Sequence, residues 1–299
     1  MMRGLLTLAF VCAVGVMPLA AQKLDLELES VTCSDLENSD GEGLGSGSMM
    51  RLSGKYDQLL SRSADEMGRP IMWTGTVRAS YAQLSNHGEA ATLYPDEIFE
   101  TAVNITHMRP MQGRWSLIIT AGVGIYTTIE DFSGKDILFN GGAMFSYHKS
   151  ENLDLGVGIG LTNSYGVPMV LPIPFVRWTS SGRYEFNVMM VGRPKVSAGM
   201  RVDEKLKLNL DVIEIEGSTA IIKVDGKRKV FSQVSTKTAF RPEYRLGRSV
   251  VNASIGCTWR RDARITSRSM KGFFKSFNHR SRNSFDPAWS LSAGYSYTF

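Results

Sequence analysis

The sequence ends in Trp289-Ser-Leu-Ser-Ala-Gly-Tyr-Ser-Tyr-Thr-Phe299, and this stretch alternates strictly between two kinds of residue. Apolar or aromatic residues stand at every second position, and serine, glycine or threonine stands between them. Successive side chains of a β-strand point to opposite faces of its sheet. The stretch therefore predicts a strand with one apolar face and one small, polar face.

Most of the preceding chain repeats this period of two. Residues 153–162, for example, place leucine, valine and isoleucine between aspartate, glycine and threonine. Pro172 and Pro174 remove backbone donors, so an edge-like or bulged strand is expected around them. On this pattern we predict twelve strands, over residues 71–84, 98–108, 114–127, 137–148, 153–162, 169–178, 183–191, 195–202, 205–223, 228–246, 249–260 and 286–299.

The connections between these strands differ in length in a regular way. Every second connection is short: residues 109–113, 149–152, 179–182, 203–204 and 247–248. Most of the others are longer: residues 85–97, 128–135, 163–168 and 261–285. Short turns on one side and long loops on the other are typical of transmembrane β-barrels. A soluble β-sandwich has no reason to segregate its loops in this way.

Together, the terminal stretch, the alternation and the connections resemble the outer-membrane β-barrel superfamily over about residues 70–299. In that superfamily the last strand carries a signal for the barrel-insertion machinery, and Tyr295, Tyr297 and Phe299 fit that signal. The resemblance implies an all-β fold, an antiparallel transmembrane β-barrel of about 12 strands, with 10 as the alternative. A closed sheet also satisfies every backbone group within lipid, and the tryptophans and tyrosines near strand ends suit an aromatic girdle.

Residues 1–21 have the pattern of a secretory signal peptide. Arg3 precedes an apolar run from Leu5 to Val16, and Ala20 and Ala21 offer a cleavage site before Gln22. The run is too short for a spanning helix, which needs about 20 residues. We therefore expect export across the inner membrane of a Gram-negative cell and, with the barrel, a location in the cell outer membrane.

The segment that follows is acidic. Residues 22–50 hold one lysine against seven carboxylates, and residues 41–48 have the glycine- and serine-rich composition of a flexible linker. We interpret residues 22–68 as a periplasmic or lumen-entering extension and residues 69–299 as the barrel domain. The alternation of Leu24, Leu26 and Leu28 with acidic residues allows one short strand within the extension.

Charged residues also recur on the face of the predicted sheet that would line the lumen. Two interpretations stay open: a polar pore whose opposed charges select small solutes, or a network of ion pairs that fills a narrow barrel. Twelve strands fall between the eight that leave room only for side chains and the 16 that leave a channel. The predicted lumen-lining charges are Arg78, Glu100, Asp154, Arg201, Lys207, Asp211, Lys237, Arg241, Glu243 and Arg245.

A basic segment, residues 261–285, is predicted to form the largest outer loop. It could bind the phosphates of lipopolysaccharide, since clustered arginine and lysine pair well with phosphate; the alternative is a solvated, mobile loop. Its basic residues are Arg261, Arg264, Arg268, Lys271, Lys275, Arg280 and Arg282. Nucleic acid is not an expected partner, because an exported barrel rarely meets it and the net charge of +5 is mild.

No catalytic site, metal site or cofactor is predicted. His148 and His279 each stand two residues before a serine, which is the residue pair of some lipid-modifying barrels. His148 falls on the side of the short turns, and His279 lies in a loop with no strand to position it. The histidines are also scattered, without the spacing of metal ligands.

Three hypotheses follow for function. The first is a passive, porin-like channel or structural barrel in contact with outer-membrane lipid and lipopolysaccharide, with small solutes as its cargo if the lumen is open. The second is a surface adhesion or interaction protein that acts through residues 261–285. The third is an outer-leaflet lipid-modifying enzyme. Composition, at 43% hydrophobic and 21% charged residues, excludes collagen-like and disordered chains.

Overall fold

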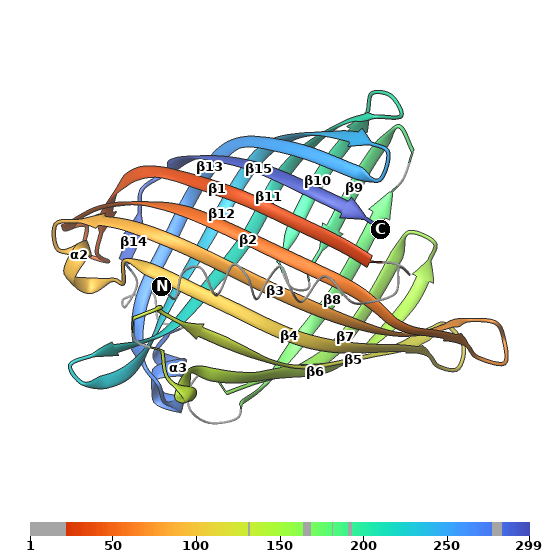
Figure 1. Ribbon diagram of the computed structural model, residues 1–299, viewed down its shortest axis with the longest axis horizontal. Helices are drawn as coiled ribbons and strands as arrows, with labels where there is room; N and C mark the ends of the chain where they lie inside the picture. Colours follow the sequence, from red (N-terminus) through yellow and green to blue (C-terminus); the bar gives the residue numbers. More distant parts are fainter. Residues whose placement is uncertain (1–21, 131, 164–168, 181, 191–192, 277–282) are drawn as a thin grey trace.

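A single closed antiparallel sheet dominates the computed structural model, which describes residues 22–130, 132–163, 169–180, 182–190, 193–276 and 283–299. The sheet closes because β1 pairs with β2 on one side and with β15 on the other (Figure 1). Within the described residues the wall has fourteen strands: β1 (Gln22–Glu37), β2 (Gly43–Ala64), β3 (Pro70–His87), β4 (Glu97–Pro110), β5 (Trp115–Thr127), β6 (Ile137–Ser150), β7 (Leu153–Thr162), β8 (Met169–Ser180), β9 (Tyr184–Met189), β10 (Lys195–Arg201), β11 (Leu206–Val224), β12 (Lys227–Leu246), β13 (Ser249–Ser267) and β15 (Ala288–Thr298).

The prediction of an antiparallel all-β barrel is confirmed, but the predicted count of about twelve strands is wrong. The two additional strands, β1 and β2, lie in the segment that we interpreted as an extension, residues 22–68, so that interpretation is also wrong. The alternation at Leu24, Leu26 and Leu28 belongs to a full-length strand whose leucines face outward. Its acidic residues face the lumen, where cationic side chains neutralise them. The expected signal peptide lies outside the described residues.

The two ends of the barrel differ as the sequence predicts. The backbone N–H of Phe299 donates to the carbonyl of Gln22 at 3.0 Å, so the first and last strands begin and end together. The six connections at this end are short, and we call it the short-turn end. The opposite end, the loop end, carries the connecting elements α2 (Ala90–Leu93), η1 (Gly134–Asp136), α3 (Met270–Ser276) and the short strand β14 (Asn283–Phe285) (Figure 1).

Three connections at the loop end are nevertheless short, one of them the β9–β10 connection, residues 190–194. The β1–β2 connection turns at Asn38, whose side chain accepts two backbone hydrogen bonds from residues 40 and 42. The β11–β12 connection is the pair Asp225-Gly226, both with positive φ, at 53° and 73°. That is the conformation of a two-residue hairpin turn, in which aspartate and glycine are favoured.

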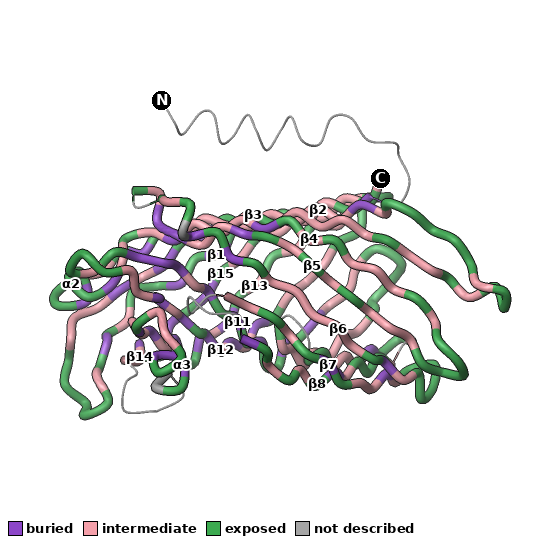
Figure 2. Tube along the Cα trace, turned by 90° about the horizontal axis from the view of Figure 1, so that it is seen from below, coloured by how far each residue is buried: buried purple, intermediate pink, exposed green. Residues whose placement is uncertain are grey.

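Exposed positions recur along the strands of the wall (Figure 2), and many of them hold large apolar residues, which form a belt on the outer face of the barrel. Val157 and Ile159 on β7 are 69% and 54% exposed, and each of the other long strands contributes similar residues. Aromatic side chains gather on this face near the short-turn end: Trp73, Trp115, Tyr147, Trp178, Tyr184, Tyr244 and Tyr295. Soluble proteins rarely expose apolar surface this continuous.

The inside of the loop end is filled by apolar side chains, which we call the outer core. Its members come from both sides of the barrel, β1–β4 with α2 and β11–β15, and they are Val31, Leu36, Met49, Ala82, Leu84, Ala90, Tyr94, Ile98, Ala220, Ile222, Phe231, Ala263, Phe285 and Ala288. The ring of Tyr94 packs 5.5 Å from that of Phe231, centroid to centroid. Its hydroxyl donates to the carbonyl of Ala263 at 3.2 Å. Opposite walls therefore touch in this half of the barrel.

Burial raises the pKa of Tyr94 to about 12, although a hydrogen bond from Asn283 partly opposes that shift. The phenol therefore stays neutral at physiological pH, as a residue in an apolar core must. Among the described residues, no helix is long and apolar enough to cross a membrane.

The shortest strands of the wall are β9 and β10, with six and seven residues. β8 pairs with β9 only through Arg177–Ser180, so most of β8 runs as an edge, as Pro172 and Pro174 predict. On the other side, β11 leaves β10 at Glu214 and continues, still paired with β12, toward β5, which it meets at Ile221 and Thr127. Strand pairing in the wall is thus complete near the short-turn end. Between β8 and β11 it is interrupted on the loop-end side of the β9–β10 hairpin.

Candidate functional site

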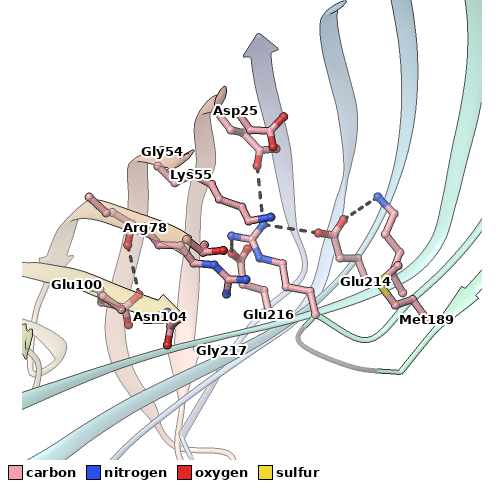
Figure 3. A pocket seen from close by; sticks show the side chains of 18 of the residues that line it. Asp25, Gly54, Lys55, Arg78, Glu100, Asn104, Met189, Glu214, Glu216 and Gly217 are labelled. Carbon is pink, nitrogen blue, oxygen red and sulfur yellow. Dashed lines mark hydrogen bonds and ion pairs between the residues drawn. The ribbon is translucent and has the colours of Figure 1, made fainter. Parts of the chain in front are cut away.

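A cavity of about 990 Å³ lies in the middle of the barrel, below the outer core (Figure 3). Side chains of β1–β6 and β8–β11 line it. It extends from Thr179, near the short-turn end of β8, to Tyr126 and Asn140, near the loop ends of β5 and β6. The cavity therefore spans much of the length of the barrel on the side away from the outer core.

One connected set of ion pairs borders this cavity, and we call it the lumen network; six of its members stand in the lining: Glu27, Arg51, Arg193, Lys195, Glu214 and Glu216. It joins five carboxylates and five cationic side chains, so its formal charge is balanced. Its members are Glu27, Glu29, Asp211, Glu214 and Glu216 with Arg51, Arg193, Lys195, Lys237 and Arg241. Within the barrel its members are provided by β1, β2 and β10–β12, and by the β9–β10 connection.

One part of the network, in which every side chain is buried, bridges two walls of the barrel. Lys237 Nζ on β12 lies 2.7 Å from Glu29 of β1 and 3.4 Å from Glu216 of β11. Arg51 of β2 pairs with the same two carboxylates, at 3.1 and 2.7 Å. All four side chains are 4–8% exposed. Each buried charge has two partners of opposite sign, which is the arrangement that lets ions remain charged away from water.

The part nearer the cavity is more accessible. Arg193 reaches in from the β9–β10 connection, with Nη2 2.6 Å from Glu216 and Nη1 3.8 and 3.9 Å from Glu27 and Glu214. Its side chain is 46% exposed. Lys195 and Arg241 hold Asp211 at 2.9 and 3.1 Å. A solute in the cavity would therefore meet both signs of charge at short range.

A β-bulge decides which acids join the network. The register of β11 shifts against both β10 and β12 between Asp211 and Glu214, so that Val212 and Ile213 both lie on the outer face. Strict alternation from Asp211 would turn Glu214 and Glu216 outward, and the sequence analysis missed them for that reason. A bulge inserts one residue and re-aims the strand beyond it.

The predicted lumen-lining charges divide into four groups. Lys237, Arg241 and Asp211 belong to the network. Arg78 and Glu100 line the cavity, with Glu100 accepting hydrogen bonds from Ser80 and from the backbone N–H of Thr219. Arg201 and Lys207 both pair with Glu185, at 2.7 and 2.6 Å, and Asp154 pairs with His148 and Arg177. Glu243 and Arg245 lie close to the last residue of β12, at the short-turn end, and Arg245 is exposed.

A family model described as a domain of unknown function (DUF6268) matches residues 17–298. The chain belongs to this family. No curated protein matches it.

Several solved structures are similar to this DUF6268 barrel. An outer membrane channel from Pseudomonas putida F1 has 9% identity and a TM-score of 0.47, over 95% of this chain and 97% of that chain. The monoaromatic hydrocarbon channel TodX, as its deltaS2 mutant, has 10% identity and a TM-score of 0.40, over 95% and 91%. The NanC porin has 8% identity and a TM-score of 0.34, over 92% and 100%. The identities and TM-scores are low, so the description of the lumen rests on the residues of this chain alone.

The basic segment 261–285 is only in part a loop, so the prediction for Arg261 and Arg264 is wrong. β13 continues to Ser267, because a bulge at Trp259 restores its pairing with β12. Arg261 points into the DUF6268 barrel, is 2% exposed, stacks 3.7 Å from the centroid of Phe285 and donates to the carbonyl of Gly47 at 2.6 Å. Arg264 pairs across to Ser232 within the sheet.

The remaining basic residues of that segment lie at or beyond the end of β13. Arg268 is half-buried directly after the strand, and burial lowers its pKa, with Asp136 opposing the shift. Lys271 is exposed on α3, and Lys275 belongs to the same helix. Arg280 and Arg282 lie outside the described residues, as does His279.

The other candidate residues give no reaction centre. His148 Nδ1 lies 2.8 Å from Asp154 Oδ1, and Asp154 also pairs with Arg177, so this histidine belongs to an ion-pair cluster near the short-turn end. Among the described residues, no group of three metal-ligating side chains converges. The terminal aromatic residues lie on β15 and after it, with the rings of Tyr297 and Phe299 4.7 Å apart in an edge contact.

Proposed function

We propose that this chain is an integral outer-membrane β-barrel that acts as a passive channel for small solutes, with the lumen network as its selectivity-determining constriction. The observation that carries the proposal is the polar cavity, enclosed by a sheet whose opposite face is apolar throughout its circumference. In lipid, a spanning sheet must close so that no backbone group is left without a partner. A soluble barrel would have no need to expose the belt.

Orientation and insertion complete this proposal. The short-turn end faces the periplasm, as in other transmembrane barrels, and the loop end faces outward, toward lipopolysaccharide. Tyr295, Tyr297 and Phe299 form the signal that the barrel-insertion machinery reads after the chain is exported with residues 1–21 as its signal peptide. The adhesion hypothesis is less favoured, because Arg261 is buried inside the barrel.

Membrane insertion is tested by placing a charge on the belt. Val157→Arg, at the middle of β7, is expected to lower the free energy of unfolding from lipid vesicles by about 2–4 kcal/mol, the cost of arginine at the bilayer midplane. Asn187→Arg, which faces the cavity, is the control and should cost less than about 1 kcal/mol, since lumen substitutions mainly tune selectivity. Urea titrations in vesicles measure both. Equal stabilities for the two variants would mean that the belt does not face lipid.

Selectivity is tested by changing the sign of one network charge. Arg193→Glu is expected to shift the cation-to-anion permeability ratio several-fold toward cations, because a unit charge at about 4 Å contributes about 1 kcal/mol even in water. Arg193 is the most exposed cation of the network, so the barrel should still fold. The reversal potential in a potassium chloride gradient measures the ratio. Arg248→Glu, an exposed residue in the β12–β13 turn, is the matched control. An unchanged reversal potential for Arg193→Glu would remove the network from the conduction path.

A further inference from the structure

The interruption of the wall between β8 and β11 has two defined edges. Among the described residues, no strand pairs with Met169–Phe175 of β8 on the side away from β7. On the facing edge, the backbone N–H of Ile215 donates to Pro194, and that of Thr219 donates across the lumen to Glu100 rather than to a strand. We call this interruption the β8–β11 opening.

The sequence of β8 suits a free edge in lipid. The carbonyl of Val176 accepts a hydrogen bond from the N–H of Met190, so the backbone groups of Val176 point away from β7. In an antiparallel strand this direction alternates, so residues 174 and 172 point into the opening as well. Both are proline. Their missing N–H groups spare the edge two donors that lipid could not satisfy.

The outer core fills the loop end between β1–β4 and β11–β15, whereas the cavity reaches the opening. The outer core joins opposite walls with side chains such as Phe231 and Leu36 that are 0–1% exposed. Gly217 and Thr219, on the β11 edge of the opening, line the cavity together with the network. A molecule in the cavity therefore lies beside the opening.

Next to the opening, the inner surface of the barrel is apolar rather than charged. On β7 and β8 the inward positions hold glycines 156, 158 and 160 and the apolar side chains of Leu171, Ile173 and Phe175. From β8 the cavity lining itself holds Arg177 and Thr179, and the lumen network lies on β1, β2 and β10–β12. A molecule that satisfies both surfaces has an apolar body and a polar or charged group.

We propose that the β8–β11 opening is a lateral portal through which small amphipathic molecules pass between the lumen and the outer leaflet of the membrane. The proposal rests on the channel function above and names its cargo. The network binds the polar group, while the apolar body moves along β7 and β8 and leaves between Ile173 and Gly217. Polar solutes without an apolar body gain nothing from this exit.

A bulky side chain at the edge tests the portal. The backbone of Gly217 lines the cavity, whereas an added Cβ would point to the outer face, where the nearest atom is the Gln233 carbonyl at 3.9 Å, so Gly217→Trp can be accommodated. The control is Gly75→Trp, on β3, which is paired on both sides; there an added Cβ meets only the Leu60 side chain, at 3.5 Å. The probe is N-phenyl-1-naphthylamine, an apolar amine that fluoresces on entering lipid, added to cells that carry the full chain in the outer membrane.

Wild type and Gly75→Trp should speed uptake of the probe several-fold over cells without the barrel, and Gly217→Trp should abolish most of that gain. Gly217→Phe serves if the tryptophan variant does not fold, as judged by heat-modifiable migration on a gel. Equal uptake by wild type and Gly217→Trp, or no gain with wild type, overturns the portal. Single-channel conductance separates the two proposals: a barrel that conducts ions but does not admit the probe retains the channel and loses the portal, whereas the absence of any conductance removes the channel itself.

Discussion

Phe231→Ala is expected to weaken the barrel and to open its outer half at the same time. Phe231 is 1% exposed and packs on Tyr94 across the lumen, so its removal leaves a cavity between two walls. Truncation of a buried phenylalanine costs about 3–5 kcal/mol. Because the outer core fills part of the loop end with apolar side chains, the same substitution should raise single-channel conductance above that of the wild type.

Phe240→Ala is the matched control, since Phe240 lies on the same strand, β12, and faces outward with 45% exposure. It should lose less stability and leave conductance unchanged. Urea unfolding in vesicles and bilayer recordings measure the two effects. Loss of stability without any rise in conductance would show that the outer core supports the barrel without sealing it. No loss of stability would contradict the packing itself.

Lys237→Met is expected to destabilise the barrel by about 3–5 kcal/mol, the usual cost of removing one partner from a buried ion pair. The substitution leaves Glu29 and Glu216, both buried, with one cation fewer between them. The penalty is the uncompensated charge, so Lys237→Met combined with Glu29→Gln should recover most of the loss.

The control for the network is Lys23→Met, which removes an exposed pair with Asp25 at 2.9 Å. Exposed pairs contribute about 0–1 kcal/mol, so the free energy of unfolding of this variant should be close to that of the wild type. Urea unfolding of the three variants gives the comparison. A double variant less stable than Lys237→Met alone would mean that Glu29 stabilises the barrel by contacts other than charge pairing.

The fold class was predictable because the period of two is a local property of each strand. Every short turn that the sequence predicts lies at the short-turn end, and Pro172 and Pro174 mark the edge of β8. β1 and β2 were missed because residues 22–48 are rich in acids, glycines and serines, which have the composition of a linker when the opposite wall is unknown. The alternation at Leu26 and Leu28 nevertheless agrees with the observed strand, in which both leucines face outward.

The residues of the site were less predictable from the sequence, because two β-bulges change which side chains face the lumen. One extra residue before Glu214 and another at Trp259 reverse the faces that follow. Alternation alone therefore placed Glu214 and Glu216 outside and assigned Arg261 to a loop. Arg193 and Arg51 were missed for a different reason: their carboxylate partners lie on strands far away in the sequence, and one chain offers no signal for such pairs.

Single-channel recording of the refolded mature chain in planar bilayers is the first measurement to make. It asks whether the lumen is a functional passage through a membrane barrel. Heat-modifiable migration on a gel first establishes that the barrel is folded. We predict discrete conductance steps whose reversal potential follows the charge of the lumen network. A folded barrel in the bilayer that never conducts would contradict this prediction.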